Sequence, residues 1–389
     1  MKVSFLFGSG VSVPAGVPKM CEITDRIMSG DVPTSQPLPY DADATHGTTL
    51  RVLRWLEIQV KRRYSCERDR VVNYEDLYFL ASQIHEDLRG NYDNPALRPL
   101  VEQAFDELLP AVPSAQGSIH EELAFLVEKV ADHIRECVRA WLVVDLRQPE
   151  YLDFLADALA ESRESGLDIL TLNHDTVLEQ YLRQKQIPYT DGFTTEPNAV
   201  GNRESKPELL DDLGCAVRIL KLHGGLDWYR FGPTGAEPWI EEYLGIPAEF
   251  RPSQRDAQGR THGNIGRLPA FLIGTSNKLW NYTDTAYLEL YHRAFRIFEG
   301  TDVLVAIGYG FGDKGINKRI TDWILKPQRR HLIVVDLDPI NLRERARVSI
   351  REKWNDWIAD KRLIPVKFDL AETLRWKSIR ERIKLTLNG

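Results

Sequence analysis

The sequence is poor in cysteine and has no long hydrophobic run. Its four cysteines, Cys21, Cys66, Cys137 and Cys215, lie far apart and form no CxxC pair. This spacing argues against a structural zinc site and against a disulfide framework, so we expect no bound metal. No apolar run reaches the roughly 20 residues that span a bilayer, and the apolar N-terminal stretch is too short for a signal peptide. We therefore expect a cytoplasmic protein that does not associate with membranes.

The sequence also has fewer basic than acidic residues. The formal net charge is -7, from 50 Lys and Arg against 57 Asp and Glu. This balance argues against a broad basic surface, so we expect no direct binding of nucleic acid. The composition is otherwise that of a globular protein, with 43% hydrophobic residues. A length of 389 residues is enough for one large domain and a smaller one.

Short apolar runs that alternate with helical patterns predict the fold class. The expected core strands are Lys2–Gly8, Leu167–Leu172, Val217–Leu222, Ala270–Ile273, Val303–Ile307 and Leu332–Val335, and 226–230 can extend the sheet. Amphipathic helices are expected at 15–28, around 316–324 and at Leu370–Leu387. A further helix is expected at Thr285–Phe298, with Leu288 and Phe298 on one face. This alternation predicts an α/β fold, a Rossmann-like doubly wound parallel sheet with helices on both faces.

Two long segments interrupt the predicted sheet. From Gly47 to Glu164 the pattern is almost entirely helical, as in Leu50–Arg63, Tyr74–Leu88 and His120–Leu146. We interpret 31–165 as a helical insertion for assembly or regulation, with 1–30 and 166–389 forming the catalytic core. The segment Pro233–Pro269 is rich in Gly, Pro, Arg and Gln, and its composition predicts a long mobile loop.

A glycine-rich turn follows the first predicted strand. Gly8-Ser9-Gly10-Val11-Ser12 lies between that strand and a predicted helix. In this position glycines let the backbone approach a diphosphate, which the N–H groups at the helix start can bind. The full GxGxxG pattern fails because Val13 occupies the third glycine position. On this motif alone, a phosphate site and a tight turn without a ligand both remain open.

Further motifs occur at predicted strand ends and resemble those of one superfamily. They are Ala15-Gly16-Val17-Pro18, Thr171-Leu172-Asn173-His174-Asp175, Lys221-Leu222-His223-Gly224, and Gly308-Tyr309-Gly310-Phe311-Gly312-Asp313 with Ile316-Asn317. With the glycine turn, they resemble the sirtuin-like superfamily, and more closely its bacterial antiphage defence branch, whose pattern is GAGxS, AGxP, TxNxD, KLHG and GYSFGDxxIN. Asn73-Tyr74-Glu75-Asp76-Leu77 is also similar to a helix start of this branch. Such motifs beyond strand ends are where open α/β sheets bind ligands.

Two departures separate this chain from deacetylase-type sirtuins. The four-cysteine zinc module of those enzymes is missing, and Lys19-Met20-Cys21 stands where they carry Asp-Phe-Arg. Both departures argue against protein deacylation. NAD+ hydrolysis needs no channel for an acyl-lysine.

The resemblance implies an NAD+ glycohydrolase, with NAD+ as substrate, and implies roles for particular residues. Asn173 would bind the ribose hydroxyls or the attacking water, and His223 would act as general base. Asp175 would steady the developing cation. The cofactor-binding residues would be Gly8, Ser9, Gly10, Ser12 and Pro18, with Gly308 and Tyr309 closing the pocket and Asp336 accepting from the adenosine ribose.

Each of these residues also has a purely structural interpretation. Asn173 can shape a turn, and a histidine at a strand end can be a hydrogen-bonded core residue. Asp175 stands before Thr176-x-x-Glu179, a possible capping box, so it can cap a helix instead. Asp336 lies close to Asp338-Pro339, which has the pattern of a plain helix start.

At the level of the organism, the resemblance implies an effector that depletes NAD+ during phage infection. It implies a homo-oligomer with a separate partner, commonly a HerA-type DNA-translocase ATPase and sometimes a short Argonaute. Two other functions stay open: a regulatory module that binds NAD+ or ADP-ribose with little turnover, and an NAD-dependent protein deacylase or ADP-ribosyltransferase. Intact Asn173 and His223 favour the hydrolase.

Overall fold

A computed structural model describes most of the chain. The described residues are 1–31, 42–63, 71–91, 94–109, 118–162, 166–233, 242–248, 253–255, 261–264, 268–274, 285–327, 330–372 and 374–388. The chain divides into two compact units. The first comprises Met1–Val17, Val143–Phe271 and Asn281–Gly389, and the second comprises Pro18–Leu142 and Leu272–Trp280.

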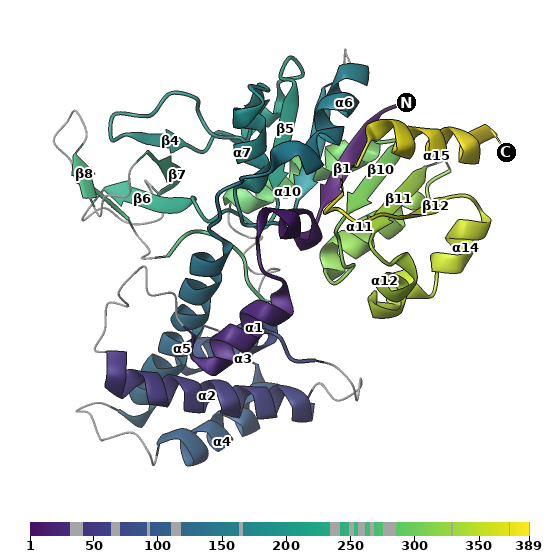
Figure 1. The fold of residues 1–389 in the computed structure, drawn as a ribbon. Coiled ribbons are helices and arrows are strands. Elements are labelled where there is room, and N and C mark those ends of the chain that lie inside the picture. The colour runs from purple at the N-terminus through teal and green to yellow at the C-terminus, as the bar shows by residue number, and fades with distance from the viewer. Residues whose placement is uncertain are drawn as a thin grey trace. The chain divides into compact units, whose positions relative to one another are not determined.

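The first unit is built on a seven-stranded sheet in which every neighbouring pair is parallel (Figure 1). Its spatial order is β12 (Leu363–Lys367), β11 (His331–Asp336), β10 (Val303–Ile307), β1 (Val3–Phe7), β2 (Leu167–Thr171), β5 (Val217–Lys221) and β3 (Tyr189–Thr190). The strands β2, β5 and β10 are buried along their whole length, as expected for a sheet covered on both faces. The predicted α/β Rossmann-like class is confirmed.

Helices cover this sheet on both faces. On the face of Phe5 and Phe7, α6 (Phe154–Glu161) brings Phe154 against both rings, and α15 (Trp376–Asn388) brings Trp376 to 5.8 Å from Phe5. Two further helices pack against each other, α10 (Thr285–Gly300) and α11 (Lys314–Ile324), and α10 also contacts β5. The remaining elements are η1 (Ser9–Ala15), η4 (Pro149–Leu152), α7 (Val177–Gln184), η5 (Pro207–Asp211), α12 (Pro339–Arg345), α13 (Val348–Arg351) and α14 (Trp354–Ala359).

The predicted inner face of α10 was wrong in part. Phe298 is buried as expected, but Leu288 is 56% exposed. The helix instead buries Tyr287, Leu290 and Ala294. The buried positions also recur every three or four residues, but three of them lie one residue before the predicted ones. Helical periodicity alone fits both sets of positions.

The segment predicted as a long mobile loop contains strands. A five-stranded antiparallel sheet runs in the order β4 (Asn202–Glu204), β7 (Tyr243–Pro247), β6 (Tyr229–Pro233), β9 (Thr261–Asn264) and β8 (Ser253–Arg255). The loop prediction for Pro233–Pro269 was therefore wrong over β7, β8 and β9. Residues 226–230 do not extend the parallel sheet, because β6 pairs with β7 and β9. The predicted strand at Ala270–Ile273 is reduced to one bridge between Gly224 and Phe271.

The second unit is helical. It contains α1 (Met20–Ser29), α2 (Ala42–Arg63), α3 (Tyr74–Leu88), η2 (Pro95–Leu97), α4 (Arg98–Leu108) and α5 (Ile119–Leu142). Asn73 caps α3, where its side chain and that of Asp76 form a reciprocal capping box. Whether 31–165 folds and acts as a separate domain stays a prediction.

The connectivity defines where a ligand can bind on the parallel sheet. From β1 the chain first builds the strands β2, β3 and β5 on one side, and it then crosses to build β10, β11 and β12 on the other. The strand order thus reverses at β1, between β2 and β10. In open α/β sheets, ligands bind in the crevice beyond the carboxyl ends of the strands at this point.

Candidate active site

Backbone approach at the reversal point requires glycine. A Cβ atom at Gly8 would lie 2.6 Å from the Gly308 oxygen, and one at Gly10 would lie 2.7 Å from the Gly308 Cα. Gly308 itself has φ +61, and its Cβ would lie 2.5 Å from the Val11 nitrogen. The turns after β1 and β10 are therefore packed backbone against backbone, which any side chain would prevent.

This packing uses N–H groups that the sequence assigned to a diphosphate. The Gly8 N–H donates to the Ile307 oxygen, the Gly10 N–H to the Gly308 oxygen at 3.0 Å, and the Val11 N–H to the Gly8 oxygen. Ser9 is exposed at the start of η1. In this conformation Gly8 and Gly10 shape the turn, and a diphosphate role for them stays a prediction.

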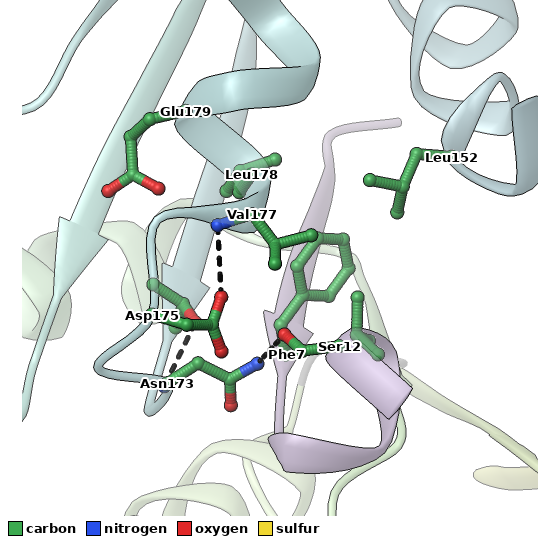
Figure 2. A pocket seen from close by; sticks show the side chains of 10 residues that line it. Phe7, Ser12, Leu152, Asn173, Asp175, Val177, Leu178 and Glu179 are labelled. Carbon is green, nitrogen blue, oxygen red and sulfur yellow. Dashed lines mark hydrogen bonds between the residues drawn. The ribbon is translucent and has the colours of Figure 1, made fainter. Parts of the chain in front are cut away.

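Asn173 joins the end of β2 to the glycine turn. Its Nδ2 donates to the Gly8 oxygen at 3.1 Å and to the Ser12 Oγ at 3.0 Å, and its backbone N–H donates to the Thr171 Oγ1. Figure 2 shows the carboxamide nitrogen facing Ser12 and the carboxamide oxygen facing the other way. Because Nδ2 is held twice, the side-chain oxygen has a fixed direction.

Asp175 and Ser12 lie on the same small cavity as Asn173. The cavity measures about 10 Å³, on the order of one water molecule. Figure 2 shows Asp175 turned toward Ser12, with Glu179 one helical turn along α7. Burial raises the pKa of the Asp175 carboxyl, although the Ser12 hydroxyl and Lys221 act in the opposite direction. The site thus holds a buried acid whose pKa lies above that of an exposed aspartate.

A buried ion cluster lies behind Asp175. The Lys221 Nζ donates to the backbone oxygen of Asp175 at 2.5 Å and to the Glu179 Oε1 at 2.8 Å. Burial acts to lower the pKa of Lys221, but nearby carboxylates, Glu179 first, together raise it. Burial also raises the pKa of Asp227. Lys221 therefore stays charged and interacts electrostatically with several carboxylates.

The predicted capping box after Asp175 is not formed. The N-cap of α7 is Thr176, which makes no side-chain cap hydrogen bond, and Glu179 binds Lys221 instead. The Asp175 Oδ1 accepts the Val177 N–H at 3.0 Å. Asp175 therefore supports the helix start while it also lines the cavity, and its catalytic role stays a prediction.

His223, at the end of β5, faces a residue from the loop after β10. Its Nε2 lies 3.3 Å from the Oδ2 of Asp313, and both side chains are mostly buried. The ring of His174 lies 6.2 Å from that of His223, centroid to centroid. Asp313 belongs to the recognised motif Gly308–Asp313 but was not among the predicted site residues.

Tyr309 stabilises the loop after β10. Its hydroxyl donates to the Asn317 Oδ1 at 2.8 Å, and the Asn317 Nδ2 donates to the Phe311 oxygen at 2.8 Å. Phe311 has φ 51, a left-handed conformation that is unusual for a non-glycine residue. These contacts give Tyr309 a structural role in the loop, and its contact with a ligand stays a prediction.

The ligand roles of two further predicted residues, Asp336 and Pro18, stay predictions. Asp336 ends β11, and its Oδ1 accepts the Asp338 N–H at 2.8 Å. Pro18 begins the second compact unit. Over the described ranges, no group of three or more His, Cys, Asp or Glu side chains is placed to hold a metal ion. Nor does any helix described there have the length and apolarity to cross a membrane.

Comparisons with known proteins agree with the motifs in one range. A family model described as a SIR2-like domain matches residues 168–358, just under half of the chain. The matched range includes Asn173, His223 and Asp313 but not the turn at Gly8–Ser12, to which Asn173 is hydrogen-bonded. No curated protein matches the chain.

Solved structures resemble the chain only distantly. A crystal structure of a Sir2 homologue–NAD complex has 14% sequence identity and a TM-score of 0.36, covering 99% of this chain and 90% of that one. A structure of Sir2 bound to an acetylated peptide has 10% identity and a TM-score of 0.32, covering 100% of this chain and 94% of that one. With TM-scores this low, the fold assignment rests on the sheet topology itself.

Proposed function

We propose that this protein is an NAD+ glycohydrolase that cleaves the bond between nicotinamide and ribose. One observation carries the proposal: at the reversal point of a parallel sheet, Asn173 is bonded to the glycine turn and its neighbour His174 packs near His223. An amide and an imidazole are thereby brought to the edge where α/β sheets bind nucleotides. The SIR2-like match over 168–358 supports the same assignment.

The reaction builds positive charge on the ribose carbon as the bond breaks. The C1′–N bond gives its electron pair to the nicotinamide ring, and nicotinamide leaves as a neutral molecule. Water forms the new C1′–O bond and yields its proton to the imidazole of His223, acting as general base. The products are nicotinamide, ADP-ribose and one proton.

Asn173 and Asp175 orient the substrate in this proposal. The fixed carboxamide oxygen of Asn173 accepts from a ribose hydroxyl or from the attacking water. Asp175, whose pKa burial raises, donates as a neutral acid to the nicotinamide amide or, when ionised, steadies the cation. Ser9, at the exposed start of the turn, and the Ser12 hydroxyl contact the diphosphate side.

The biological role follows from the resemblance of the motifs to the defence branch. We propose an effector that depletes NAD+ during phage infection, assembled as a homo-oligomer with a separate partner such as a HerA-type ATPase. The helical unit is the proposed surface for that assembly.

The test is nicotinamide release from NAD+ by the purified protein, with and without an acetylated peptide. We expect release without peptide, and we expect Asn173→Ala and His223→Ala to lower the rate by at least about 10²-fold. Asn341→Ala and His292→Ala, at exposed positions, are matched controls that keep the full rate. Binding of NAD+ without release would favour a regulatory module, and release only with peptide would favour a deacylase.

A further inference from the structure

Asp313 is held in two directions at once. Its Oδ1 accepts the Ile316 N–H at 2.9 Å as the N-cap of α11, which fixes the plane of the carboxylate. Its Oδ2 then lies 3.3 Å from the His223 Nε2. The two residues come from the ends of β10 and β5, which β1 and β2 separate in the sheet. The contact therefore spans the reversal point.

The loop that carries Asp313 is built to hold it in place. The hydroxyl of Tyr309 and the carboxamide of Asn317 bind each other and fasten the loop to α11. The guanidinium of Arg347 donates to the Gly312 oxygen from the opposite side. A residue that served only as a helix cap would need none of this support, because a cap depends on its own helix.

A second aspartate in the same unit shows what capping alone looks like. Asp338 follows β11 and its Oδ1 accepts the Asn341 N–H at 3.2 Å, capping α12. Asp338 is exposed, whereas the Asp313 side chain is only 13% exposed. A carboxylate that faces a buried imidazole in low dielectric interacts with it far more strongly than one in water.

We propose that Asp313 is the positioning residue for His223. Its carboxylate faces Nε2 and fixes a negative charge beside the ring. It then stabilises the imidazolium that forms, as the aspartate does for the histidine of a hydrolase triad. This inference rests on the proposed function for its catalytic consequence, but the state of the ring can be tested without catalysis.

The groups around His223 are few. The charged partner is Asp313 from the loop after β10, and the titratable neighbour is His174 from the end of β2. The ring of His174 itself packs on Phe271 at 5.0 Å. Replacing the Asp313 carboxylate therefore removes the negative charge that faces His223.

The experiment compares Asp313→Asn with Asp338→Asn in the full-length protein. Asparagine can keep the cap of α11 through its oxygen, but it removes the negative charge that faces Nε2. We expect nitrogen-15 NMR of labelled histidine to show that the imidazolium of His223 loses its proton at a lower pH in Asp313→Asn than in the parent. Asp338→Asn should leave the spectrum of His223 unchanged.

Kinetics give the second readout. We expect Asp313→Asn to lower kcat for nicotinamide release by about 10²-fold with little change in KM. The acidic limb of its pH profile should move to lower pH, since the imidazolium has lost its counter-charge. An unchanged titration of His223 by NMR, or an unchanged pH profile in an active enzyme, would overturn the inference. If the parent protein releases no nicotinamide, the proposed function fails, and the NMR result alone decides the role of Asp313.

Discussion

The two ends of the same strands carry buried charges in different ways. At the amino end, Asp168 on β2 receives the Arg218 Nε at 2.6 Å and the Lys2 Nζ at 2.7 Å, so two cations share one carboxylate. At the carboxyl end, one cation, Lys221, serves Glu179 directly and also interacts with Asp175 and Asp227. The two clusters can be compared because both lie on the same pair of neighbouring strands. Across β2 and β5, Asp168 pairs with Arg218 at one end and Thr171 pairs with Lys221 at the other.

The difference separates a structural ion pair from a site. Where cations outnumber carboxylates, the buried carboxylate of Asp168 is fully compensated. Where carboxylates outnumber the cation, burial raises the pKa of Asp175 and Asp227. Groups with shifted pKa values beside a cavity are typical of functional sites. Under the proposed function, we therefore assign the cluster at the amino end to stability and the one at the carboxyl end to the site. Three matched pairs of substitutions test this comparison.

The largest effect is expected from removing the cations. Lys221→Met and Arg218→Met should each lower the free energy of unfolding by about 3–5 kcal/mol, because each leaves buried carboxylates with less compensation. Lys221→Met should cost more at neutral pH, since Asp168 keeps Lys2 in the other variant. Denaturant unfolding of both variants measures the difference, and equal losses would remove the distinction between the ends.

The stability lost in Lys221→Met should depend on pH. In Lys221→Met the native carboxyls of Asp175 and Asp227 hold protons more tightly than in the unfolded chain, because burial raises their pKa. The stability of this variant relative to the parent should therefore recover as the pH falls through those raised values. Unfolding at pH 8 and pH 5 checks the sign, and a deficit that grows toward acid would contradict it.

An intermediate effect is expected at two glycines with the same backbone conformation. Gly166, before β2, has φ +62, and its Cβ would lie 2.7 Å from the Cys215 oxygen; Gly308, after β10, has φ +61 and meets Val11. Alanine should cost about 1–3 kcal/mol of stability at either position. Only Gly308→Ala should also lower nicotinamide release, when both are assayed at a temperature where both are folded. Equal loss of activity would argue against a site at the turn.

The smallest effect is expected at two buried serines. The Ser4 Oγ pairs with the Thr301 Oγ1 at 2.8 Å, whereas the Ser12 Oγ accepts from Asn173. Ser4→Ala and Ser12→Ala should each lower the free energy of unfolding by about 1 kcal/mol. Ser12→Ala should in addition lower the rate of nicotinamide release, since Asn173 loses an anchor. If Ser4→Ala impaired the rate as much, the proposed role of Ser12 would be wrong.

The sequence predicted the elements whose signals are local. Buried parallel strands such as Val303–Ile307 are continuous apolar runs, so their positions were predicted well. Asn173, Asp175 and His223 were identified as candidates because the motifs that contain them, at the ends of such runs, resemble those of the sirtuin-like superfamily. The small antiparallel sheet was missed because β4, β8 and β9 are three or four residues long and polar. Such strands exist through pairing with distant partners, which composition does not reveal.

The amino-acid sequence alone determined the parallel α/β class and the polar residues that end its strands, because hydrophobic periodicity and glycine turns act over a few neighbouring residues. Only the tertiary structure decided which of those residues meet. It fastened Asn173 to the glycine turn, placed Asp313 against His223 from the other side of the reversal, and left Asp336 bonded to its own loop. The order of strands in a sheet is set by packing between segments far apart in sequence, so such contacts have no local signal.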